Sequence, residues 1–119
     1  MDDARTFADH AWRRGMRPEP QLLVSEWADR FRLLPSTSAE PGRWRTDRTP
    51  YLREIMDSLS VSSPTERVVI IKGAQTGGTE AGLNFLGYVI CNAPGLAMLV
   101  MPSVDMVRRN TRTRIDPYF

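Results

Sequence analysis

The spacing of apolar and polar residues predicts helices along much of the chain. Apolar side chains recur every three or four positions in four stretches, as they do on one face of an amphipathic helix. These stretches are residues 1–15, 25–34, 50–59 and 79–90. Ser25 and Thr49 suit helix caps, and Pro50 suits the first position of its helix, where its missing amide hydrogen is not needed. Ser103 predicts the cap of a further helix near the C-terminus.

Two continuous apolar runs predict buried strands. Residues 68–71 are a β-branched run bounded by turn residues, and residues 96–101 form a second run that Pro102 ends. Because a helical pattern lies between them, we expect an α/β fold with parallel strands and a right-handed crossover, preceded by N-terminal helices. Two strands leave sheet edges unpaired, so we expect the chain to be the first part of a larger domain.

The turn between the first predicted strand and the next helix is rich in glycine. It comprises Lys72, Gly73, Ala74, Gln75, Thr76, Gly77, Gly78 and Thr79. Small residues let backbone amides curl around an anion, and the helix N-terminus adds partial positive charge at the same point. This context predicts phosphate binding, with Thr79 supplying the hydroxyl that ligates Mg²⁺. The alternative is a glycine-rich connection that carries a surface lysine.

The cation of this loop is displaced from its usual position. Against the common pattern G-x-x-x-x-G-K-[ST], Gly78 stands where the lysine belongs and Lys72 stands at the first glycine. Lys72 is also the only lysine in the chain. Because such a loop folds back around the phosphates, we expect the long ammonium side chain of Lys72 to reach the β and γ phosphates from the first position.

Composition narrows the class of protein further. The chain has 119 residues, 41% hydrophobic and 25% charged, and its net charge of +2 comes from 16 basic and 14 acidic residues, as in many folded proteins. The single cysteine, Cys91, and the single histidine, His10, exclude a disulfide framework and a Cys/His zinc site. The acidic start is unlike a signal peptide, and no apolar run is long enough to span a membrane. We therefore expect a cytoplasmic protein with no membrane partner.

Several other side chains have two interpretations each. Tyr51 suits either an adenine contact or a packed helix position. Trp44 lies in a polar loop and is a weaker adenine candidate, since docking on the core also explains it. Gln75 suits either a contact with the γ phosphate or a hydrogen bond within the turn. The helical spacing of Trp27 and Phe31 predicts core positions for both.

The basic residues near the C-terminus also allow two interpretations. They are Arg108, Arg109, Arg112 and Arg114. They span two helical turns and cannot share one face, so a solvated surface is the default. The alternative is contact with the DNA backbone, or an arginine that acts in trans at a ring interface. Cys91, at an apolar helix end, is interpreted as a small buried residue.

Five blocks of sequence resemble the large terminase subunit of lambda-like (GpA-type) tailed phages, the motor that packages DNA into proheads. They are residues 17–20, 26–29, 42–44, 50–56 and 72–80, in the order and spacing of that family. Members commonly carry a deviant phosphate-binding loop whose lysine stands first, as Lys72 does here. Several members also have a lysine at the position of Gly78, so in this chain Lys72 is the sole candidate.

The resemblance implies a partial P-loop ATPase core of the additional-strand type in residues 21–119. It also implies that residues 1–20 form a helical segment that contacts the small terminase subunit; the alternative is that this amphipathic helix packs on its own domain. The implied cofactors are ATP and Mg²⁺, and double-stranded DNA and the portal are further partners of the complete protein in the host-cell cytoplasm. The complete protein would couple ATP hydrolysis to DNA translocation and cut concatemeric DNA with a separate endonuclease domain.

Acidic residues that the complete motor needs are missing from this sequence. No apolar strand ends in Asp-Glu, and no carboxylate cluster suits two-metal nuclease chemistry. We therefore expect no catalytic residue in this chain, leave its enzymatic activity open, and interpret it as truncated before those elements. Two alternatives remain, a fragment of a helicase-like nucleic-acid ATPase and a non-enzymatic interaction module that keeps the subunit-binding helix.

Overall fold

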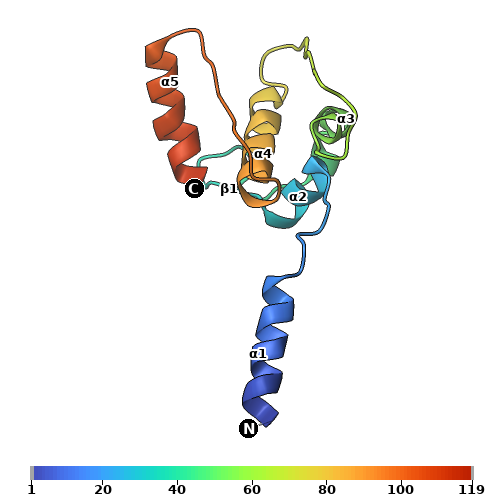
Figure 1. Ribbon diagram of the computed structural model, residues 1–119. Helices are drawn as coiled ribbons and strands as arrows, with labels where there is room; N and C mark the ends of the chain where they lie inside the picture. The colour runs from blue at the N-terminus through green and yellow to red at the C-terminus, as the bar shows by residue number, and fades with distance from the viewer. Residues whose placement is uncertain (1, 119) are drawn as a thin grey trace.

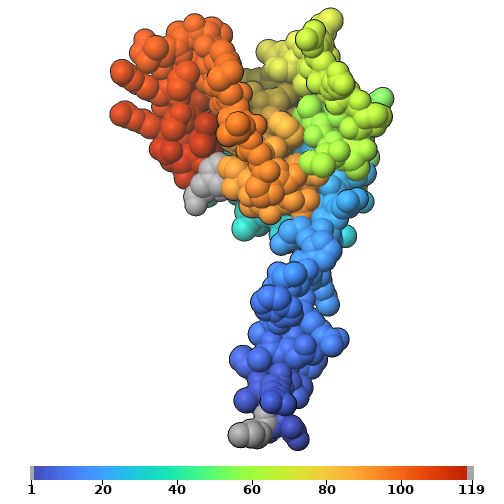
Figure 2. Space-filling view, viewed as in Figure 1, coloured from blue at the N-terminus to red at the C-terminus, as the bar shows by residue number. Residues whose placement is uncertain are grey.

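The chain folds into a helical body from which one helix projects, as the computed structural model in Figure 1 shows for residues 2–118. The helices are α1 (Asp2–Gly15), α2 (Val24–Phe31), α3 (Tyr51–Ser58), α4 (Gly78–Cys91) and α5 (Val104–Asn110). A π-helical segment, η2 (Thr111–Ile115), and a 3₁₀ turn, η3 (Asp116–Tyr118), continue α5. The projecting helix α1 gives the molecule a longest dimension of 63 Å and forms a stalk in Figure 2.

Helices α2, α3 and α4 pack against one another around an apolar core. The core consists of Leu22, Val24, Trp27, Ala28, Trp44, Leu52, Met56, Ala81 and Tyr88. Met56 of α3 and Ala28 of α2 are completely inaccessible to solvent. Ile55 and Leu59 are partly buried against this core. The predicted helices are therefore confirmed, except that the one predicted over residues 25–34 ends at Phe31, and most apolar stripe positions of α2, α3 and α4 are at least partly buried.

A small sheet that the sequence pattern did not predict closes the loop after α2. Strand β1 (Leu33–Leu34) pairs antiparallel with β2 (Gly42–Arg43) in the register Leu33↔Arg43 and Leu34↔Gly42. The amide of Trp44 then donates to the carbonyl of Arg32 over 3.0 Å. This pairing brings Trp44 into the core, so docking of its ring, the simpler of its two interpretations, is what the structure shows. A 3₁₀ turn, η1 (Thr46–Arg48), leads on to α3.

Two predicted helix caps are wrong, because neither the Ser25 hydroxyl nor the Thr49 hydroxyl caps its helix. The amide of Val24 donates to Ser60 Oγ over 2.9 Å and that of Ser25 to Asp57 Oδ1 over 3.2 Å, so the end of α3 caps α2. The Ser25 hydroxyl is buried with no hydrogen-bond partner among the described residues, and so is that of Thr49. Ser103 does cap α5, since its Oγ accepts from the amide of Met106 over 3.3 Å.

The two predicted parallel strands are absent from the described residues 2–118, where β1 and β2 make up the only sheet. Residues 68–71 and 96–101 have no regular structure, and the side chain of Ile71 is 98% exposed. A strand makes no ladder hydrogen bonds until a neighbouring strand supplies the partners, and neither segment has such a neighbour among the described residues. Of the α/β prediction, the N-terminal helices are confirmed and the parallel-strand core is not formed.

Two predictions about single side chains also differ from the structure. Phe31 is 61% exposed, so only Trp27 of that pair belongs to the core. Cys91 is exposed rather than buried. The helix predicted over residues 1–15 is confirmed, but Trp12 is 68% exposed because α1 does not fold back on the body. The four C-terminal arginines are exposed, which agrees with their default interpretation as a solvated surface.

Candidate functional site

The glycine-rich loop of residues 72–79 curls tightly before it enters α4. Gln75 and Gly77 have φ values of 54° and 84°, in the left-handed region that glycine tolerates best. The Thr76 hydroxyl donates to the carbonyl of Gly73 over 3.2 Å, which closes the turn internally. Gly77 is the cap of α4, and its carbonyl accepts from the amide of Ala81 over 2.9 Å. The loop therefore ends at a 14-residue helix whose first amides point back toward it.

The side chain of Lys72 lies across Gly78. A Cβ added to Gly78 would lie 2.5 Å from Lys72 Cε and closer still to Cδ, so no larger residue fits there while Lys72 keeps this position. The Lys72 ammonium donates to the carbonyl of Gly73 over 3.5 Å, which keeps it at the loop. The first residue of the loop thus fills the space that a lysine at position 78 would need.

Tyr51 joins the first turn of α3 to the loop. Its hydroxyl donates to the carbonyl of Thr76 over 2.8 Å, although Thr76 is 25 residues further along the chain. The side chain is 56% exposed, so Tyr51 is not a core residue of α3. Its ring lies beside the loop with much of its surface accessible, which is compatible with stacking against a planar group.

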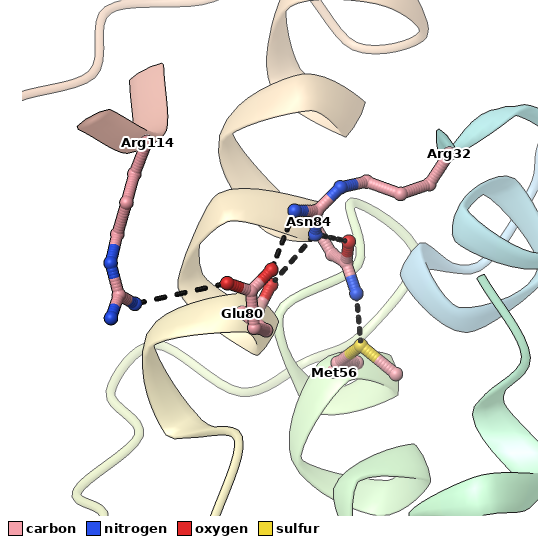
Figure 3. A network of polar contacts seen from close by, with 5 residues as sticks. All are labelled: Arg32, Met56, Glu80, Asn84 and Arg114. Carbon is pink, nitrogen blue, oxygen red and sulfur yellow. Dashed lines mark hydrogen bonds and ion pairs between the residues drawn. The ribbon is translucent and has the colours of Figure 1, made fainter. Parts of the chain in front are cut away.

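A buried polar network behind the loop was not found by sequence reasoning (Figure 3). Arg32, directly after α2, is 3% exposed, and its guanidinium donates to Glu80 Oε2 over 2.5 Å and also to Asn84 Oδ1. Asn84 Nδ2 in turn lies 3.4 Å from the sulfur of Met56 on α3. Glu80 and Asn84 are four residues apart and therefore lie on one face of α4, which was the indication of this network in the sequence.

Two cavities flank the start of α4 and divide the predicted site residues between them. One, of about 840 Å³, is lined by Tyr51, Gln75, Thr76, Gly77 and Glu80 together with arginines of β2 and the following turn. The other, of about 570 Å³, lies between α4 and residues 96–101 and is lined by Gly78 and Thr79. Lys72, Gly73 and Ala74 line neither of these two cavities. The larger one is of a size typical for small-molecule sites.

One protein family matches this sequence, the phage terminase large subunit gpA, ATPase domain, over residues 38–119. The matched range covers more than half of the chain and contains the whole loop of residues 72–79. The chain belongs to this family. Comparisons with curated proteins and with solved structures gave no match. The resemblance inferred from the five sequence blocks is thereby confirmed.

A terminase ATPase domain uses ATP, and the loop has the features that a phosphate group requires. It has left-handed backbone at Gln75 and Gly77, a helix N-terminus directly behind it, and a lysine held above Gly78. The described residues include no group of three or more His, Cys, Asp or Glu side chains that could hold a metal ion. Within the same range, no helix has the length and apolar character needed to cross a membrane.

Proposed function

We propose that this terminase chain binds Mg·ATP with a phosphate-binding loop whose lysine stands first. The observation that carries the proposal is the position of Lys72, whose methylene stem lies over Gly78 at the start of α4. In the common form of the loop, a lysine at the position of Gly78 supplies the cation for the β and γ phosphates. Lys72 is the only lysine of the chain and lies against that same backbone position from the other end of the loop.

Each of the remaining loop residues has a role in this proposal. Backbone amides of residues 73–79, among them those of Gly73, Ala74, Gln75, Thr76 and Gly78, surround the phosphates. Thr79, exposed in the first turn of α4, ligates Mg²⁺ together with the nucleotide. Bound Mg²⁺ neutralises charge on the phosphate oxygens. Tyr51, on the wall of the larger cavity, contacts the adenine.

We extend the proposal to the fold around the loop. Residues 68–71 and 96–101 flank the loop and α4 in the order expected of a strand, helix, strand unit. Their apolar side chains are exposed as they stand, with Ile71 at 98% and Met98 at 87%. We propose that they pair as parallel strands of an additional-strand ATPase core when further strands are present. Residues 21–119 would then belong to the ATPase domain.

The wider role follows from membership of the family. In the complete protein, we propose, ATP hydrolysis drives double-stranded DNA through the portal into the prohead in the host-cell cytoplasm, and a separate endonuclease domain cuts the DNA. Residues 1–20 would contact the small terminase subunit. What supports this last role is that α1 has no buried residue and stands clear of the body.

The test is a calorimetric titration of the chain with ATP and with AMP, in the presence of Mg²⁺. Lys72→Ala should weaken ATP binding by about tenfold to a hundredfold, the range of a charge-assisted contact, and AMP binding much less, because AMP lacks the β and γ phosphates. Arg67→Ala, which removes a cation from the exposed chain before the loop, is the matched control and should leave both affinities unchanged. Equal ATP affinity in Lys72→Ala and the unmodified chain would show that the lysine-first mechanism is wrong.

A further inference from the structure

The buried guanidinium of Arg32 makes a charged contact with a carboxylate next to the loop. Arg32 is 3% exposed and follows the last turn of α2. Its Nη2 donates to Glu80 Oε2 over 2.5 Å, and its Nη1 donates to Asn84 Oδ1 and, over 3.4 Å, to the carbonyl of Glu80. The indole of Trp44 lies against the same guanidinium, 5.7 Å from ring centroid to Cζ. These contacts fix the first two turns of α4 against α2.

Glu80 places a negative charge next to the loop that is proposed to bind phosphate. It follows Thr79 directly, lies in the first turn of α4, and lines the larger cavity together with Gln75, Thr76 and Gly77. A carboxylate free to turn into this cavity would repel phosphate oxygens. Its second oxygen, Oε1, lies 3.8 Å from Arg114 Nη1, so cations approach the carboxylate from two sides (Figure 3).

We propose that Arg32 is a positioning residue for the nucleotide loop, which pairs with Glu80 and thereby keeps that negative charge from the phosphates. This inference rests on the proposed function, because it assumes that the cavity beside the loop receives a phosphorylated nucleotide. Through Asn84 and Met56 the same contacts join α2, α3 and α4. Arg32 thus sets the electrostatics of the larger cavity and holds the first turns of α4, on which Thr79 lies.

The neutralising role predicts effects that grow with the charge of the ligand. Arg32→Met should weaken ATP binding by about tenfold or more, within the range of interactions with charged groups, and AMP binding clearly less. Glu80→Gln keeps an oxygen for Arg32 but removes the negative charge. It should therefore bind ATP about threefold or more tightly, and AMP nearly as before. The double variant Arg32→Met, Glu80→Gln should recover most of the ATP affinity lost in Arg32→Met.

The experiment is a titration of each full-chain variant with ATP, ADP and AMP in the presence of Mg²⁺, with folding checked by circular dichroism. Glu54→Gln, which removes the same charge from an exposed position on α3, is the matched control and should not alter the affinities. If Arg32→Met does not fold, Glu80→Gln decides the question by itself, since unchanged or weaker ATP binding in Glu80→Gln contradicts the proposal. Equal losses for ATP and AMP in Arg32→Met would also contradict it, because a purely structural role acts on both ligands alike.

Failure of this inference can be told apart from failure of the proposed function. If Lys72→Ala weakens ATP binding while Glu80→Gln fails to strengthen it, the loop binds nucleotide and only the role of Arg32 is wrong. If the unmodified chain and Lys72→Ala bind ATP alike, the proposed function itself is wrong and the role of Arg32 falls with it.

Discussion

The two sides of α4 are built very differently. On the side of α2 and α3, Ala81, Asn84 and Tyr88 are at most 2% exposed, and the start of α2 is capped by Asp57 and Ser60. On the side of residues 96–101, Phe85 and Leu86 border a cavity of about 570 Å³, and Leu96 is fully exposed. The same helix therefore has one face in a packed core and one face that residues 96–101 cover incompletely.

The difference shows which backbone hydrogen bonds a segment can form without a partner elsewhere in the chain. A helix satisfies most of its backbone hydrogen bonds internally, so α2, α3 and α4 needed only an apolar stripe each to form and pack. A strand depends on a neighbour for every ladder hydrogen bond, and residues 68–71 lie beside no other strand. The packed side of α4 should therefore determine stability, and the other side should contribute little.

The largest expected effect comes from comparing a methionine-to-alanine substitution on the packed side of α4 with the same substitution on the other side. Met56→Ala removes a side chain with no solvent exposure and should lower the free energy of unfolding by about 2–5 kcal/mol. Met98→Ala, in the segment on the other side of α4, removes a side chain that is 87% exposed and should change it by less than about 0.5 kcal/mol. Urea denaturation followed by circular dichroism measures both. A large loss in Met98→Ala would show that residues 96–101 pack in solution.

A second pair of substitutions compares the loop with the helix that follows it. Gly77→Ala places a side chain at φ 84°, with its Cβ 3.0 Å from Leu52 Cδ1, and should cost about 1–2 kcal/mol. Gly82→Ala, in the middle of α4 with nothing within 4 Å of the new Cβ, should stabilise the chain by up to about 1 kcal/mol. Thermal unfolding should thus shift in opposite directions for the two variants. Shifts in the same direction would mean that the loop is not held in the turn described above.

Sequence reasoning succeeded where local chemistry decides and failed where distant partners decide. The helices and the cap at Ser103 depend on residues within a few positions of one another, and they were predicted. The caps of α2 come from Asp57 and Ser60, more than 30 residues away, and no local pattern reveals them. The same reason explains why Arg32 was missed.

The loop illustrates both outcomes within one site. The displaced lysine was visible in the spacing of Lys72, Gly77 and Thr79, because the motif is short and contiguous. The bond from Tyr51 to Thr76 joins positions 25 residues apart, so the sequence suggested Tyr51 as a candidate but not this contact. Some loop residues line one cavity and some the other, and this depends on where residues 96–101 lie. No local sequence pattern reveals that position.

A third comparison removes the serine side chain that caps α2 in one variant and the serine side chain that caps α5 in another. Ser60→Ala deprives the buried amide of Val24 of its acceptor and should lower the free energy of unfolding by about 1 kcal/mol. Ser103→Ala deprives the exposed start of α5 of its cap, and water can replace the lost acceptor there. Global stability should therefore change less in Ser103→Ala. Urea midpoints compare the two variants, and equal losses would mean that α5 unfolds together with the body.

The smallest expected effect concerns an ion pair far from both faces of α4. Two nitrogens of Arg48, Nε at 3.0 Å and Nη2, donate to the carboxylate of Glu40, and each side chain of the pair is 59% exposed. The hydrogen bond from Arg48 holds the pKa of Glu40 below its ordinary value of 4.5; desolvation opposes this shift, and the charges of Arg48 and Arg45 lower the pKa further. Water and salt screen this pair more than the part-buried Arg32–Glu80 pair, in which the arginine side chain is only 2% exposed.

The sign of its pH dependence follows from the direction of that shift. A carboxyl group with a lowered pKa in the folded state stabilises the fold above the pKa of its unfolded form, and this contribution is lost as the pH falls through the folded pKa. The pKa of Glu40, measured by NMR titration of its carboxyl carbon, should lie below 4.5 and return toward that value in Arg48→Gln. Added salt should reduce the difference, because the pair is exposed. An unchanged pKa in Arg48→Gln would show that the two side chains do not pair in solution, whereas a pKa shift that salt removes would confirm an exposed and screened ion pair.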